Sequence, residues 1–262
     1  MMASLVAIFG ETRKSILISW TYRANTLVGM ATISLIFLGI GFLMGDGQFD
    51  LEEMNSMYVG IIGWYYAMMA MNDLSFGIRG EINAGTLEQM SMSRLPLSLV
   101  LMGRILANLF VNTIEIIIIG LALTWLIGIN IPMNWQGVVA LLLMMVGVWG
   151  FGYVIAGATL IFKQIESLAN LFSNILVFLN GSLLPVTSMP TWMASISLLL
   201  PTTLGVVVLR GILLEGQSLQ AAWMHGSLKW LLVQSVAYYI GGYLFFKYCE
   251  RVAKQHGSLG QY

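Results

Sequence analysis

The sequence has 262 residues, of which 58% are apolar and only 9% are charged, and its formal net charge is zero. Because a soluble domain carries about 25% charged residues, this composition predicts a membrane protein. The balanced charge, with no lysine- or arginine-rich tail, removes the electrostatic basis for binding nucleic acid.

The residue types that metal and redox sites require are scarce. Cys249 is the single cysteine and the two histidines are His225 and His256, so the sequence supports neither an intrachain disulfide nor a zinc site. It also has no phosphate-loop, H-E-x-x-H or G-x-S-x-G motif. We therefore expect no catalytic site, no metal and no cofactor in this chain, and any energy for work on a substrate must come from elsewhere.

Six segments are long and apolar enough to cross a bilayer, since about 20 apolar residues in a helix span roughly 30 Å. They are residues 27–44, 54–72, 105–127, 138–162, 166–185 and 228–246. None alternates with period two, as a barrel strand would. The sequence predicts an all-α polytopic membrane protein, one transmembrane domain over residues 1–262 with six transmembrane helices.

Basic residues indicate the orientation, because cytoplasmic loops are enriched in lysine and arginine. With the N-terminus inside, the cytoplasmic segments hold ten of the twelve basic residues. The outer loop 45–53 has four carboxylates and no basic residue. We expect a multi-pass protein with both termini in the cytoplasm, including the tail 249–262.

Two segments outside the spans are expected to enter the membrane only partly. Residues 1–24 place apolar side chains at helical spacing between charges, as in an amphipathic helix lying in the interface. A frayed terminus is the alternative. Residues 185–225 are apolar but interrupted by Pro185, Pro190 and Pro201, each of which removes a backbone donor. There we expect short re-entrant helices that dip in from the outer face.

The cytoplasmic loop 79–97 contains a bounded polar helix. Thr86 and Gln89 have the spacing of a capping box, in which hydroxyl and amide satisfy backbone donors at a helix start. Gly85 permits a sharp entry, and Pro96 disfavours helical geometry at the preceding residue. The sequence predicts a short helix over residues 87–94, which either binds a partner or rests against lipid headgroups.

Polar side chains form two stripes inside predicted spans, where polar and charged groups are costly and suggest function. Glu115, Asn112 and Asn108 share one helix face in the third span, and Asn170 and Asn174 share one in the fifth. Each stripe either lines a substrate pathway or hydrogen-bonds neighbouring helices together. Both interpretations stay open at this point.

Two motifs resemble those of one known family. E-I-N-A-G-T-L-E-Q followed by L-P-L-S-L-V-L-M-G-R, within residues 81–104, is similar to the interior loop of type-2 ABC transporter permeases, the ABC-2 family. G-S-L-L-P-V-T-S-M-P-T-W-M-A-S-I-S-L-L-L-P-T-T followed by L-R-G-I-L-L-E-G, within residues 181–216, is similar to the outer loop of the same family. The first motif looks closest to the multidrug and antibiotic-resistance branch.

The resemblance implies a permease subunit of an ATP-driven exporter in the plasma (inner) membrane of a prokaryote. Its cargo would be an amphiphilic drug, natural product or lipid-linked compound. Its partners would be membrane lipid, a second permease copy (homodimer or paralogue heterodimer) and a nucleotide-binding ATPase subunit that holds ATP and Mg.

The resemblance also assigns roles to residues. The interior loop would be the coupling helix that seats on the ATPase, with the contacts carried by Glu81, Gly85, Thr86, Leu87, Glu88, Gln89 and Pro96. The outer re-entrant segment would be marked by Pro185, Pro190, Trp192, Pro201 and Arg210. The substrate pathway or dimer interface would include Asn108, Asn112, Glu115, Asn170 and Asn174.

Two other classes of membrane protein remain as alternatives. A gradient-driven secondary carrier needs titratable groups near the midplane, usually in repeated halves, and among the span residues only Glu115 qualifies. A non-transporting membrane anchor or assembly subunit would need no polar stripe along the fifth span.

Overall fold

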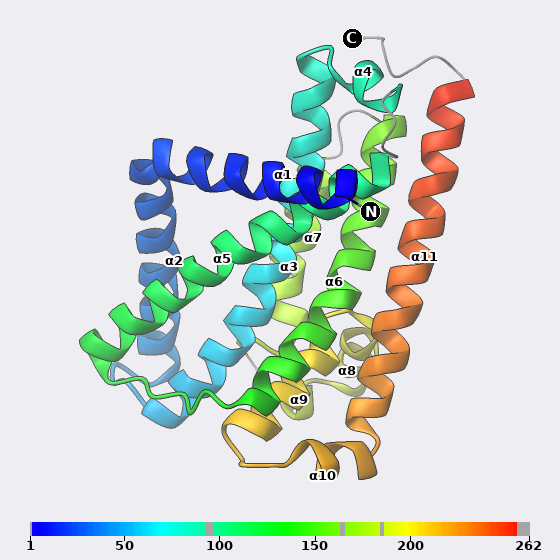
Figure 1. The fold of residues 1–262 in the computed structure, drawn as a ribbon. Coiled ribbons are helices and arrows are strands. Elements are labelled where there is room, and N and C mark those ends of the chain that lie inside the picture. Colours follow the sequence, from blue (N-terminus) through cyan, green and yellow to red (C-terminus); the bar gives the residue numbers. More distant parts are fainter. Residues whose placement is uncertain (1, 93–96, 163–165, 184–185, 256–262) are drawn as a thin grey trace.

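The computed structural model describes residues 2–92, 97–162, 166–183 and 186–255. Within these ranges all regular structure is helical, without a strand (Figure 1). The helices are α1 (Met2–Thr21), α2 (Arg23–Met44), α3 (Leu51–Asn83), α4 (Leu87–Ser91), α5 (Leu97–Ile127), α6 (Trp135–Phe162), α7 (Glu166–Leu179), the 3-10 helix η1 (Val186–Ser188), α8 (Thr191–Leu199), α9 (Thr203–Leu213), α10 (Leu219–Met224) and α11 (Ser227–Gln255). The predicted all-α class is confirmed.

Several helices have the length and composition of membrane spans. In the described part of the chain, α2, α5 and α6 are long and apolar enough to cross a membrane, and the bent pair α8 and α9 would add a fourth span if it crosses as one. Helices α3 and α11 have 33 and 29 residues, which exceeds the ~20 that a span needs, but they are less apolar. The chain is a membrane-integral helical protein, and six spans stay a prediction.

Helix ends agree with the sequence where the apolar run and the helix stop together. Helices α2, α5 and α6 end at Met44, Ile127 and Phe162, the ends of the predicted spans. Helix α3 instead continues eleven residues past the predicted end at position 72, to Asn83. The predicted end marks where the apolar run stops, whereas the helix continues as long as its backbone hydrogen bonds do. The last three turns of α3, which are polar, therefore lie beyond the predicted span.

Helix α7 is shorter than its predicted span and ends at Leu179 rather than at position 185. The side chain of Asn180 accepts hydrogen bonds from the backbone N–H and the hydroxyl of Ser182. Gly181 follows with a φ of +81°, a left-handed conformation that favours glycine. These local contacts compete with the helix and stop it.

The centre of the bundle is α6, which packs along α11 on one side and α3 and α9 on the other (Figure 1). Gly150 of α6 and Gly242 of α11 meet directly, because a Cβ built on Gly242 would overlap the backbone of Gly150. Small residues let helices approach this closely in membranes. The α6–α11 pair therefore forms through backbone contact and not only through side chains.

Helices α1 and α2 stand at the edge of this bundle. Helix α1 ends beside the start of α2, and the chain changes direction between the two helices (Figure 1). Of the 22 residues of α2, only Met30, Phe37 and Gly41 are buried. Helix α1 packs mainly on α5. A helix is present where the interfacial helix was predicted, and its position in a membrane interface stays a prediction.

The end of the bundle opposite α4 is built from short helices. Helices α8 and α9 meet at 93°, and Pro201 lies in the break between them. Pro190 is the residue that precedes the first turn of α8, where proline costs no helical hydrogen bond. The proline positions thus divide this segment as the sequence suggests, and insertion from the outer face stays a prediction.

Candidate functional site

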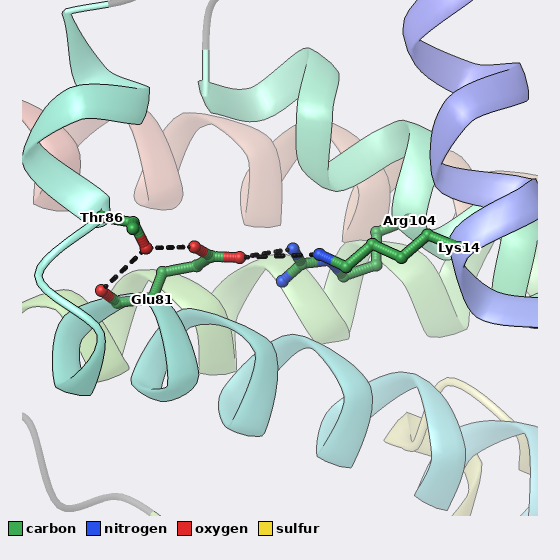
Figure 2. A network of polar contacts seen from close by, with 4 residues as sticks. All are labelled: Lys14, Glu81, Thr86 and Arg104. Atoms are coloured by element: carbon green, nitrogen blue, oxygen red, sulfur yellow. Dashed lines mark hydrogen bonds and ion pairs between the residues drawn. The ribbon is translucent and has the colours of Figure 1, made fainter. Parts of the chain in front are cut away.

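A polar network joins four elements at the α4 end of the bundle (Figure 2). Glu81, in the last turn of α3, accepts a hydrogen bond at Oε2 from the hydroxyl of Thr86, just before α4. Its Oε1 accepts from Nη2 of Arg104 on α5 at 2.9 Å, and Nζ of Lys14 on α1 lies 4.0 Å from the same oxygen. One carboxylate therefore connects α1, α3, α4 and α5.

The local backbone explains why Thr86 reaches Glu81. Gly85 has a φ of +69°, which turns the chain back after α3. The backbone N–H of Thr86 bonds to the carbonyl oxygen of Glu81, and the hydroxyl of Thr86 bonds to the carboxylate. The Thr86 hydroxyl is thus used for Glu81, and not for the capping box with Gln89 that the spacing predicts.

The network is partly shielded from solvent. The side chain of Arg104 is 9% exposed, that of Glu81 20% and that of Lys14 52%. Burial alone would raise the pKa of Glu81, but hydrogen bonds from Thr86 and Arg104 outweigh it, so that the pKa is lowered below its usual value. Gly77 makes room for the guanidinium, because a Cβ there would overlap Nη1 of Arg104.

The residues of the predicted coupling helix divide into an anchored side and an exposed side. Leu87 is buried in the same apolar cluster as Ile82 and Leu101, and Met90 packs against that cluster. Gln89 is exposed, and the side chain of Met92, just after α4, is 80% exposed. Pro96, Arg94 and the side chain of Glu88 lie outside the described residues.

A cavity of about 730 Å³ opens beside this network, between α1, α2, α3 and α5. On α3, its wall repeats every four residues through Tyr65, Met69, Asp73, Gly77 and Glu81, which is one helix face. Ligand cavities in proteins are typically ~300–1,000 Å³, so the space suits a drug-sized molecule.

The predicted polar stripe of α5 faces this cavity. Asn108, Asn112 and Glu115 all line it. Asp73 of α3 hydrogen-bonds with the two asparagine side chains, and the hydroxyl of Tyr65 donates to Oε2 of Glu115. The stripe therefore both lines a cavity and ties α5 to α3, and a role in a substrate pathway stays a prediction.

Sequence reasoning missed Asp73, Tyr65 and the pairing of Glu81 with Arg104. The spacing of four residues from Tyr65 through Asp73 to Glu81 would have placed the two carboxylates on one helix face. Which helix faces them could not be derived, because Arg104 lies 23 residues along the chain from Glu81.

The polar stripe of α7 lies apart from the cavity. Asn170 and Asn174 are exposed and do not line it. Between them, the backbone carbonyl of Ser173 accepts a hydrogen bond from the indole N–H of Trp64 at 2.7 Å, which holds α7 on α3. The two predicted stripes therefore do not form one site within a single chain.

The predicted outer segment lies at the opposite end of the bundle (Figure 1). Arg210 of α9 donates from Nε and Nη2 to the backbone carbonyl of Ser56, at 2.9 and 2.8 Å, and from Nη2 to that of Ser182 at 3.3 Å. Trp192 is exposed, and Pro185 lies outside the described residues. Arg210 thus fixes α9 to the start of α3.

Nothing in the described ranges groups three or more histidine, cysteine, aspartate or glutamate side chains in a way that could hold a metal ion. The arrangement is a cavity with a hydrogen-bonded polar network at one end.

Comparison with known proteins identifies a family. The model of the family described as ABC-2 type transporter matches residues 7–214, a range that includes the polar network, the cavity and Arg210. A search of curated proteins finds no match for the chain.

Proposed function

Because the chain belongs to the ABC-2 type transporter family, we propose that it is the permease subunit of an ATP-driven exporter. It moves an amphiphilic drug, natural product or lipid-linked compound out across the plasma membrane of a prokaryote. A separate nucleotide-binding subunit binds ATP and Mg and hydrolyses the nucleotide. The observation that carries the proposal is the network of Glu81, Thr86 and Arg104, which ties α4 to the cavity helices.

The network gives α4 a mechanical role. Leu87 anchors α4 in the apolar cluster, and Thr86 binds its start to the carboxylate of Glu81. A displacement of α4 by a partner is passed to α3 through Glu81 and to α5 through Arg104, the two helices that carry the polar wall of the cavity. Closure of the ATPase thereby changes the cavity.

The exposed side of the loop supplies the contact with the ATPase. Gln89 and Met92 point away from the apolar cluster, whereas Met90 packs against it. Methionine suits adaptable contact surfaces because its side chain is flexible and polarizable. We assign the contact with the ATPase to this exposed side.

The exposed polar stripe of α7 supports assembly with a second permease copy. Asn170 and Asn174 are exposed in a single chain, on a helix whose second half is mainly apolar. Asparagine side chains facing lipid are unfavourable, and they are better satisfied by hydrogen bonds across a helix interface. We place the dimer contact on this face, with six spans per chain and cytoplasmic termini.

A gradient-driven carrier is the second candidate. Asp73 and Glu115, two titratable side chains, line the same cavity, and carriers of that class use such groups. The experiment below separates the two functions.

Co-purification tests the proposed function. The tagged permease is co-expressed with its untagged genomic neighbours, and we expect a subunit with a phosphate loop to co-purify and transport to require ATP. Met92→Asp should weaken co-purification, whereas Met133→Asp, at a comparably exposed methionine (70% against 80%) between α5 and α6, should not. Transport that follows a proton gradient without any co-purifying ATPase would refute the proposal in favour of the carrier.

A further inference from the structure

We propose that the cavity between α1, α2, α3 and α5 binds the cationic head of an amphiphile, held by Asp73 and Glu115. The proposal rests on the proposed transport function and names the substrate class of that cavity. It is carried by three observations: the volume of the open cavity, the distribution of acidic and basic side chains along its walls, and the apolar and aromatic surface beside the carboxylates.

More acidic than basic side chains line the cavity. Three carboxylates, those of Asp73, Glu81 and Glu115, line it, together with two basic side chains, Arg104 and Lys14. Both basic groups lie against Glu81 at its α4 end. The cavity therefore has one more acidic than basic side chain, and its two other acidic groups lie away from that end.

The two remaining carboxylates have neutral hydrogen-bond partners. Glu115 accepts from the hydroxyl of Tyr65, and Asp73 bonds with the side-chain amides of Asn108 and Asn112. In the described part of the chain neither carboxylate lies within ion-pair distance of a basic side chain, although Arg104 acts on Asp73 electrostatically. Charged carboxylates inside a membrane protein are costly unless a cation accompanies them, so the geometry favours a ligand that brings the positive charge.

The rest of the wall suits an amphiphile. Met30 and Ile33 of α2, Met69 of α3 and Val111 of α5 supply apolar surface, and the ring of Phe76 lies on the same wall. Aromatic rings attract cations through their electron-rich faces. A ligand with a cationic head and an apolar body matches both parts of the cavity, and its volume of about 730 Å³ accommodates one drug-sized molecule.

The weak packing of α2 supplies a route of entry. Only three residues of α2 are buried, and Gly29, which lines the cavity, has open space where a side chain would be. An amphiphile dissolved in the lipid can therefore reach the carboxylates past α2 without unpacking the central bundle.

Binding to the purified permease in lipid nanodiscs tests the proposal without any ATPase. The probes are tetraphenylphosphonium and tetraphenylborate, which share size and shape but have opposite charge. We expect tetraphenylphosphonium to bind more tightly, and Glu115→Gln and Asp73→Asn each to weaken it by roughly tenfold or more, because a buried unit charge opposite the cation is removed. Binding of tetraphenylborate should not weaken in these variants.

An occluding variant keeps the test valid if the carboxylate variants fold poorly. Gly29→Leu fills open space in the cavity and should abolish binding with both carboxylates intact. Gly39→Leu, on the same helix and also facing open space but outside the cavity, is the matched control and should bind as the wild type does.

Each contrary outcome overturns the proposal. Equal affinity for both probes would show that the cavity binds apolar molecules without preference for charge. Tighter binding of tetraphenylborate would show that it is an anion site. Unchanged affinity in folded Glu115→Gln and Asp73→Asn proteins would remove the carboxylates from the site. Failure of this binding while an ATPase co-purifies refutes only the substrate class, whereas binding by a permease with which no ATPase co-purifies refutes only the export function.

Discussion

One arginine holds each end of α3, and the two arginines do so by different chemistry. Arg104 pairs with the carboxylate of Glu81 near the end of α3, within reach of solvent and of a third charge from Lys14. Arg210 instead donates to the backbone carbonyls of Ser56, near the start of α3, and Ser182. A carboxylate can be protonated and then release its arginine, whereas backbone carbonyls do not titrate.

The difference indicates which end of α3 moves. At the α4 end, the titratable carboxylate of Glu81 and the glycine turn at Gly85 allow contacts to be exchanged. At the α9 end, backbone groups of two segments converge on one guanidinium. We therefore expect Arg210 to contribute mainly to stability and Arg104 mainly to the transmission of movement.

The largest loss of stability is expected for Arg210→Met. The change removes three hydrogen bonds and leaves the carbonyls of Ser56 and Ser182 short of donors, which costs about 2–4 kcal/mol in unfolding free energy. Thermal unfolding in detergent should show a clearly lowered Tm. Arg251→Met, at an exposed site on α11, is the control and should leave the Tm unchanged. Equal Tm values for the two variants would disprove the role of Arg210.

A smaller loss of stability and a larger loss of transport are expected for Arg104→Met. The carboxylate of Glu81 keeps Thr86, Lys14 and partial contact with water, so the cost is about 1–2 kcal/mol. Because the link from α4 to α5 is lost, ATP hydrolysis by the assembled exporter should continue with little transport.

Arg104→Lys separates the effect of charge from that of geometry. It retains the charge without the planar fork of the guanidinium, and it should restore stability more than transport. Full transport in Arg104→Met, at normal protein levels, would rule out transmission through this pair.

Acid should weaken the α4 end and spare the α9 end. Since the pKa of Glu81 is lowered on folding, its contribution to stability is complete above the ordinary glutamate pKa of about 4.3 and is lost as pH falls through the lowered value. The Tm difference between wild type and Glu81→Gln should therefore be constant above about pH 5 and shrink below about pH 4.

The same pH series on Arg210→Met supplies the contrast. The backbone carbonyls that Arg210 contacts do not titrate in this range, so its Tm difference from wild type should stay constant. Parallel pH curves for Glu81→Gln and Arg210→Met would show that the two ends do not differ in this respect.

The smallest effect is expected for Lys14→Ala. Its Nζ lies 4.0 Å from Glu81, and the side chain is half exposed, so the pair contributes at most about 0.5 kcal/mol and is screened by salt. The Tm in low salt should fall slightly more than in 0.5 M salt. Arg13→Ala, the adjacent exposed basic residue, serves as the control, and an equal response of the two variants would remove Lys14 from the network.

The sequence predicts the fold best where one property determines an element. The apolar runs that end at Met44, Ile127 and Phe162 coincide with helix ends because lipid exposure and helix length coincide there. The apolar runs do not predict the ends of α3 and α7. Asn72 and Asp73 interrupt the apolar run without breaking the helix, and Asn180 with Gly181 breaks the helix within an apolar run.

The site is predictable along one helix but not across helices. The stripe of Asn108, Asn112 and Glu115 follows from the 3.6-residue repeat and faces the cavity in the structure. Its partners Asp73 and Tyr65 depend on how α3 packs against α5, which one sequence does not encode in any local pattern. The spacing of Thr86 and Gln89 predicts a capping box. It gives no indication that the Thr86 hydroxyl donates to the carboxylate of Glu81 instead.

The contact between Gly150 and Gly242 holds α6 and α11 backbone against backbone, and a side chain at either position would force the two helices apart. The cavity is lined by α1, α2, α3 and α5, so a change in its volume comes from movement of these helices. We expect the α6–α11 pair to serve as the stationary reference frame, from which distances to the other helices should report the motion.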